Sequence, residues 1–242
     1  MRKYFQYSIS IMLGMSLAAF SACSGLVDVY DELPEEVTSQ YPQLKITATT
    51  YDNWTYISLH QPEADPILLD IPQTLTGEWD GVTCYTRQQI KLGTTTELSS
   101  TPTDTQPDPE EWDLAFHHFD VRTHNGVSFQ TSYSSLDELP EHLSDIPDIA
   151  WEADQLTKDR VWVDLSSSLA FNIGCQTIAI SLPLSNMASM DVSNPPPIYN
   201  VSGKVCLLRM ADGTVAALKL DNYMNEKGKK GYLTISYIYP YE

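Results

Sequence analysis

Basic residues are scarce in this chain. Of its 242 residues, 14 are Lys or Arg and 32 are Asp or Glu, which gives a formal net charge of −18 at pH 7. Nucleic-acid binding depends on clustered Lys and Arg side chains, so this composition argues against a nucleic-acid partner. An anionic membrane surface is disfavoured as a charge-driven partner for the same reason. Aromatic residues make up 10% of the chain, which is too many for a disordered protein.

The sequence also lacks the short motifs that carry catalysis. It contains no G-x-S-x-G, H-E-x-x-H, G-x-x-x-x-G-K-[ST] or G-x-G-x-x-G pattern. Without a C-x-x-C pair, neither a thioredoxin-like redox site nor a zinc ribbon is indicated. Acidic residues are numerous, but no pair is singled out for glycoside hydrolysis. We therefore expect a protein that is not an enzyme and has no zinc site.

Residues 1–22 have the organisation of a secretory signal peptide. Arg2 and Lys3 precede an apolar run from Ile9 to Phe20, which is too short to span a bilayer comfortably. The sequence F-S-A-C at residues 20–23 resembles a bacterial lipobox, although Phe stands where Leu or Val is usual. This resemblance makes Cys23 the lipidated, palmitate-carrying first residue of the mature chain. The alternative is an ordinary cleaved signal followed by an incidental cysteine.

After removal of residues 1–22, the mature chain has 12 basic and 32 acidic residues, a net charge of −20. Residues 23–42 are acidic and short of aromatics, which predicts a tether between the lipid and a folded domain at 43–242. Residues 200–242 differ from this acidic chain, because their six basic and four acidic residues give a net charge of +2.

Three cysteines remain besides Cys23, namely Cys84, Cys175 and Cys206. Because three is an odd number, at least one thiol is unpaired. Export permits one disulfide, but the sequence does not indicate which pair forms it.

Apolar residues alternate along much of the chain, which predicts a mainly β, antiparallel domain with many short strands and little helix. Alternation over 44–48 and a β-rich run over 54–59 predict two strands joined by a turn. Residues 61–110 contain six prolines and a Thr/Ser-rich run. We expect a long surface insertion there, with a short hairpin around Val82 to Leu92.

Residues 112–122 are apolar at both alternate sets of positions, which predicts one central strand buried on both faces. This strand would place His117 and His118 on opposite faces, and we expect structural roles for both. Turns are predicted at 124–126, 211–213 and 228–231, a short capped turn at 134–138, and further strands at 161–165, 177–182, 203–210, 214–220 and 232–239.

Three segments, in this order, resemble a known family. They are TATTYDNWTYISL at 47–59, WDLAFHHFDVRTHNG at 112–126, and residues 199–241 with LLRMADGTVAALKL and GKKGYLTISYIYPY. They are similar to the HmuY-like haem-binding lipoproteins (haemophores) of Bacteroidota. The resemblance implies a single β domain on the outer membrane that captures haem, or a related tetrapyrrole, from host haemoproteins or neighbouring bacteria. It further implies delivery to a TonB-dependent outer-membrane receptor.

The resemblance also implies where haem iron is coordinated. The family uses a pair of His or Met side chains, one of them in the loop before the segment that matches residues 195–199. Here that loop contains Met187 and Met190, two of the four methionines in the mature chain. The alternative is that both methionines pack as apolar fillers.

The second family ligand follows the strand that matches residues 161–165, and here the sequence departs from the family. Residues 166–182 contain no Met, His or Tyr, and Cys175 is the only soft ligand among them. Either Cys175 takes the role, or coordination is one-sided, or the scaffold has lost its haem site and binds a protein or glycan partner. Candidate pocket walls are Trp162, Phe171, Ile173 and Ile178, and candidate cations for the haem propionates are Lys204 and Arg209.

Overall fold

We describe the protein from a computed structural model. It describes residues 38–49, 53–62, 108–162, 178–191, 193 and 198–242, and the strand backbones at 67–70, 76–79, 82–85, 90–91, 94–95 and 175–177. The predicted signal peptide, Cys23, and most of the predicted tether and insertion lie outside the described residues.

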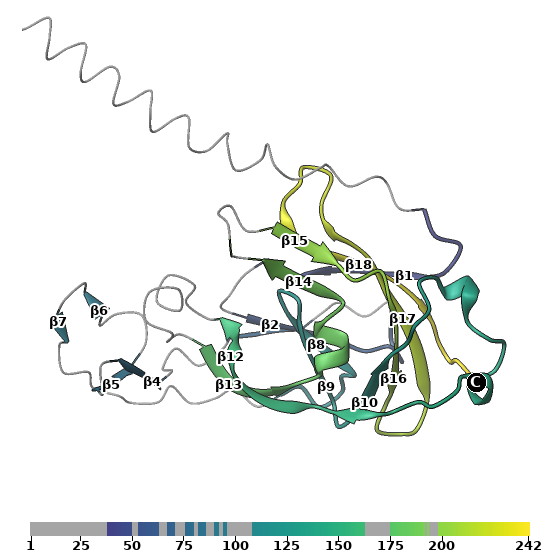
Figure 1. Ribbon diagram of the computed structural model, residues 1–242, viewed down its shortest axis with the longest axis horizontal. Helices are drawn as coiled ribbons and strands as arrows, with labels where there is room; N and C mark the ends of the chain where they lie inside the picture. Colours follow the sequence, from purple (N-terminus) through teal and green to yellow (C-terminus); the bar gives the residue numbers. More distant parts are fainter. Residues whose placement is uncertain are drawn as a thin grey trace, which may run out of the picture.

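Two antiparallel sheets form the body of the protein (Figure 1). The larger sheet has the order β1-β18-β17-β16-β10-β11 and the smaller has the order β3-β2-β8-β9. The strands of the larger sheet are β1 (Gln43–Thr47), β10 (Val127–Gln130), β11 (Glu152–Ala153), β16 (Val205–Arg209), β17 (Val215–Met224) and β18 (Lys230–Ile238). Those of the smaller sheet are β2 (Asn53–Ile57), β3 (Ile67–Asp70), β8 (Leu114–His117) and β9 (Asp120–Thr123). The predicted mainly β fold is confirmed.

Two separate hairpins extend from this body toward the same side of Figure 1. One pairs β12 (Gln155–Trp162) with β13 (Cys175–Ile180), and the other pairs β14 (Ala188–Asp191) with β15 (Ile198–Val201). The short helix α3 (Leu182–Ser185) connects them, and the Ser181 hydroxyl caps its first turn. Within the part of the chain that the structure describes, no helix is long and apolar enough to cross a membrane.

The remaining elements are short. They are β4 (Thr76–Trp79), β5 (Val82–Tyr85), β6 (Ile90–Lys91), β7 (Thr94–Thr95) and the 3-10 turns η1 (Leu136–Glu138) and η2 (Leu143–Asp145). The Ser135 hydroxyl accepts a hydrogen bond from the backbone N–H of Asp137, so the predicted capped turn is confirmed.

The main core lies between the two sheets and draws buried side chains from both. Leu114 and Phe116 come from the smaller sheet, and Leu208, Leu218 and Ile235 come from the larger one; each is 0% exposed. Because these residues alternate with others along their strands, each sheet turns one continuous apolar face toward this core.

The other face of β8 is buried as well. Ala115 packs in a second cluster with Trp54 of β2 and Val161 of β12, so this cluster joins the smaller sheet to the β12–β13 hairpin. A third cluster, which includes Leu136 and Val205, covers the outer face of the larger sheet. The predicted burial of the 112–122 segment on both faces is confirmed for β8.

The same segment is not one strand, however. β8 and β9 form a hairpin, in which His117 pairs with Asp120, and the chain reverses at His118 with a φ of 53°. A left-handed residue other than glycine is uncommon, and no Gly or Pro marks this turn in the sequence. The prediction that His117 and His118 lie on opposite faces of a strand was therefore wrong, and their rings are 5.7 Å apart between centroids.

Two predicted hairpins also differ from the structure. β1 and β2 are strands as expected, but β1 pairs with β18 and β2 pairs with β3 and β8. In the insertion, β5 pairs with β4 and β6 with β7, so there is no single hairpin over 82–92. Alternation identifies a strand and its buried face but does not identify the strand it pairs with. The predicted hairpin of β16 and β17 is confirmed, with Gly213 at a φ of 88° in its turn.

Gly231 is required where β18 passes the end of β1. Its φ is +84°, and a Cβ atom there would stand 2.8 Å from the carbonyl oxygen of Ala48. Gly203 has a similar φ of +67°, but a Cβ there would meet nothing within 4 Å. We expect Gly203→Ala to cost about 1–2 kcal/mol of unfolding free energy, from the left-handed backbone alone. Gly231→Ala should cost clearly more, because the added clash displaces β1. Urea unfolding measures both, and equal costs would contradict this account.

Candidate functional site

The turn between α3 and β14 carries the first of the two candidate methionines. The backbone N–H of Met187 donates to the carbonyl oxygen of Leu184 at 3.1 Å, and its own carbonyl accepts from the N–H of Ser202 at 2.8 Å. The Met187 side chain is 2% exposed and belongs to the main core. In this folded state Met187 packs as an apolar filler, and its sulfur reaches a ligand only if the turn opens.

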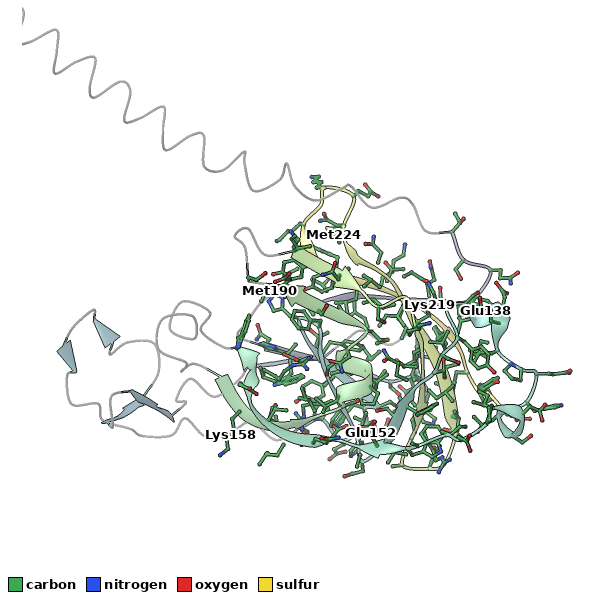
Figure 2. The ribbon with its side chains drawn as sticks, in the orientation of Figure 1. Glu138, Glu152, Lys158, Met190, Lys219 and Met224 are labelled. Carbon is green, nitrogen blue, oxygen red and sulfur yellow. The ribbon has the colours of Figure 1, made fainter. Side chains whose placement is uncertain are left out.

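Met190 has a different environment. It lies on β14 and is half-buried, whereas its neighbours Ser189 and Asp191 are exposed. In the register of the hairpin it stands opposite Tyr199 of β15, so the two side chains share one face. Figure 2 shows Met190 at the same end of the molecule as Met224.

An aromatic group, consisting of Phe119, Tyr199 and Tyr223, lies beside this face. The rings of Tyr199 and Tyr223 stack at 5.4 Å between centroids, and Phe119 meets them edge-on at 6.5 and 6.1 Å. The ammonium nitrogen of Lys230 lies 4.9 Å from the Tyr199 ring centroid. Through this group the β14–β15 hairpin packs against β17 and the β8–β9 turn. Met190 therefore stands opposite Tyr199, the ring of this group that also lies beside Lys230.

His118 contacts the aromatic group through Tyr223. Its Nδ1 lies 3.2 Å from the Tyr223 hydroxyl, and the side chain is buried. Burial, reinforced by the neighbouring His117, lowers the pKa of His118 to about 3, so the ring is neutral at physiological pH. This geometry fits the structural role expected for His118.

A charged contact holds the turn between α3 and β14, which consists of Asn186 and Met187 and is called the methionine turn below. Arg160 of β12 donates to Asp120 of β9 through Nε at 3.2 Å, with Nη2 also 3.2 Å from the same Oδ1 atom. Its Nη1 donates to the side-chain oxygen of Asn186 at 3.2 Å. Asp120 is 2% exposed, and burial raises the pKa of its carboxyl to about 6 even though Arg160 opposes this shift.

The other residues singled out from the sequence lie as follows. Lys204 donates to Ser132 and Ser134, and Arg209 stacks over Trp151 at 4.2 Å, so both cations contact the 132–151 segment. Their assignment to the haem propionates stays a prediction. Lys230 is a further cation, beside Tyr199 on the strand that pairs with Met190.

Two of the four residues predicted to form apolar walls of a haem pocket lie among the described residues. Trp162 is half-buried at the end of β12, and Ile178 packs against the second core cluster. Phe171, Ile173 and the side chain of Cys175 lie outside the described residues. Cys206 is a free, buried thiol in the main core, and burial raises its pKa to about 12, so it is inert at physiological pH.

Sequence reasoning missed the aromatic group and Arg160. Tyr199 stands in a segment that the family resemblance covers, and its partner Tyr223 is 24 positions further along. Phe119 also stands in such a segment, at 112–126, whereas Arg160 stands in none of them. Only the fold brings Phe119 to the rings of Tyr199 and Tyr223, and Arg160 to the end of α3.

A second set of titratable groups joins the two sheets away from Met190. The Nδ1 atom of His60 lies 3.0 Å from Asp113, and its Nε2 lies 3.0 Å from Asp212 in the β16–β17 turn. The hydrogen bond with Asp113, and after it the one with Asp212, raises the pKa of His60 above the ordinary histidine value of 6.5. In the described part of the chain, no three His, Cys, Asp or Glu residues are grouped so that they could hold a metal ion.

This bridge predicts a pH-dependent stability. Because the folded state holds the proton of His60 more tightly than the unfolded state, the bridge stabilises fully below pH 6.5. Its contribution is lost as the pH rises through the raised pKa. His60→Gln should therefore lower the unfolding free energy at acidic pH and match the wild type at alkaline pH in a series of urea titrations. The exposed His142→Gln is the control. A deficit for His60→Gln that grows with pH would contradict the assignment.

Comparison with known proteins places this fold in one class. The family model described as HmuY protein matches residues 50–237. A solved structure from Bacteroides fragilis, assigned as a lipoprotein, is 31% identical with a TM-score of 0.64 over 86% of this chain and 94% of that one. A structure from Bacteroides vulgatus, assigned as a HmuY-like haem-binding protein, is 31% identical with a TM-score of 0.63 over 87% of this chain and 100% of that one.

The apo HmuY analogue of Tannerella forsythia shares the fold at 18% identity, with a TM-score of 0.59 over 84% of this chain and 97% of that one. None of the curated proteins matches significantly in sequence. The fold is thus that of a HmuY-like antiparallel β protein. The chain belongs to the HmuY family.

Proposed function

We propose that this protein binds haem, or a related tetrapyrrole, with Met190 as an axial ligand of the iron. Support comes from family membership and from the Bacteroides vulgatus relative, which is assigned as haem-binding. The observation that carries the proposal is a half-buried thioether on β14 beside the aromatic group. Met187 is the second candidate, and it becomes available only when its turn opens.

The chemistry of these residues suits such a ligand. A thioether is a soft donor of the kind that haem iron accepts, and aromatic rings offer a flat apolar surface for a macrocycle. Lys230 would supply the positive charge that carboxylate side groups prefer. Cys175, at the start of β13, stays a candidate for the second axial position. Binding and release, without chemical conversion, would be the whole activity.

A haem titration of residues 24–242 tests this proposal. We expect a saturable complex with a Soret band shifted from that of free haem, in both the oxidised and the reduced protein. A spectrum identical to free haem in both redox states would reject iron ligation.

We also propose that the protein is held at the outer membrane by a lipid on Cys23, faces outward, and passes its ligand to a TonB-dependent receptor. The lipobox-like sequence, the acidic residues 23–42 and the Bacteroides fragilis relative support the anchor. Labelling cells with a palmitate analogue should mark the wild-type protein and leave Cys23→Ser unmarked. Equal labelling of both proteins would contradict lipidation at Cys23.

A second candidate function is a non-haem binding module that engages a protein or glycan partner. The absence of Met, His and Tyr from residues 166–182 favours it, because this is where the family places the other ligand. The haem titration separates the two functions. A partner captured from solution by a protein that does not bind haem would establish the second.

A further inference from the structure

The β12–β13 hairpin forms a sheet of its own, so its position relative to the body depends on side-chain contacts. Its register shifts between Thr157 and Val161, where β12 contains three residues against one on β13. Bulges of this kind re-aim side chains. Here Val161 packs into the second core cluster while the adjacent Arg160 reaches β9 and the end of α3.

Arg160 therefore joins three elements at one point. Its guanidinium binds Asp120 at the start of β9 and Asn186 at the C-cap of α3, and Asn186 directly precedes Met187. β9 holds α3 as well, since the N–H of Val121 donates to the Ser185 hydroxyl at 2.9 Å. A planar guanidinium with a fixed set of donors can hold two acceptors in one geometry, which an ammonium group cannot do equally well.

We propose that Arg160 is a positioning residue that fixes the methionine turn, and through it β14 with Met190, relative to the β12–β13 hairpin. The proposal rests on the proposed function for its biological meaning. The carboxylate of Asp120 is buried, so its charge-assisted hydrogen bonds are strong and the guanidinium is held firmly. In a haem-binding protein, this contact would set the distance between the β12–β13 hairpin and the strand that carries Met190.

The NMR signals of the methionine methyl groups report the position of the methionine turn. The mature chain has only four methionines, so each signal can be followed separately. Methyl NMR of the haem-free protein should show altered signals for Met187 and Met190 in Arg160→Met, while those of Met210 and Met224 stay at their wild-type positions. Lys158→Met, on the same strand, removes an equal charge from an exposed side chain that points outward in Figure 2, and should alter none of the four. Each of these two variants adds one methionine, and the added signal is recognised because the wild-type spectrum lacks it.

Arg160→Met leaves Asp120 without its cation, so it can fail to fold. Arg160→Lys keeps the charge but loses the second arm of the fork, and should fold with smaller shifts confined to the same two signals. Unchanged Met187 and Met190 signals in Arg160→Lys and in a folded Arg160→Met, or equal changes in all four, would overturn the proposal.

Haem titration of the same variants separates this inference from the proposed function. If the wild type binds haem, Arg160→Met should bind it about 10-fold more weakly, as is usual when a group that orients a metal ligand is lost. If the wild type does not bind haem, the proposed function fails, while the methyl signals still decide whether Arg160 positions the turn.

Discussion

Replacing Met190 with alanine is expected to weaken haem binding by about 10–100-fold, at least as much as the loss of a residue that only orients a metal ligand. The reason is that Met190 is the half-buried thioether on β14, whereas Met187 is 2% exposed in the core. The Soret band of the variant should also shift toward that of haem with one ligand fewer. A titration followed by visible absorption measures both effects.

Met224→Ala is the matched control, because Met224 is also half-buried and lies at the same end of the molecule (Figure 2). It should bind haem as the wild type does. Wild-type binding by Met190→Ala would contradict Met190 as a ligand. If Met187→Ala then lost binding while remaining folded, the turn after α3 must open when haem binds.

Leu114→Ala is expected to lower the free energy of unfolding by about 2–5 kcal/mol. Leu114 is 0% exposed on β8, the strand that is buried on both faces, and its loss leaves a cavity between the two sheets. Leu156→Ala makes the same chemical change on β12, where the side chain is 68% exposed. That variant should change stability by less than about 0.5 kcal/mol. Urea unfolding of both variants measures the difference, and comparable losses would contradict this assignment of the core.

The strands were predictable wherever an apolar strand pattern and a turn signal coincide. The β16–β17 hairpin has both, with a nearly continuous apolar run on either side of Asp212-Gly213. The β8–β9 hairpin has the pattern without the signal. Its turn uses His118 in a left-handed conformation, which nothing local in the sequence requires. The partners of β1 and β2 were equally out of reach, because alternation does not say which strand lies alongside.

The segment that carries the candidate site was predictable, but the burial and the contacts of its side chains were not. The family resemblance points to Met187 and Met190, which are three positions apart. Which of them is buried depends on where α3 ends and β14 begins. The contacts around them come from distant parts of the chain. Arg160 meets Asp120 across 40 positions, and His118 meets Tyr223 across 105. Such contacts follow from the packing of the sheets and leave no local signature.

Iron X-ray absorption of the haem complex decides whether Met190 coordinates the iron, because it identifies the atoms bound to the metal. We expect sulfur in the first shell of the wild-type complex and, in the same amount, in that of Met224→Ala. In Met190→Ala the sulfur contribution should fall by one atom, which leaves none unless Cys175 fills the second axial position. A first shell made of nitrogen and oxygen alone in the wild type, or a sulfur contribution that is unchanged in Met190→Ala, would contradict coordination by Met190.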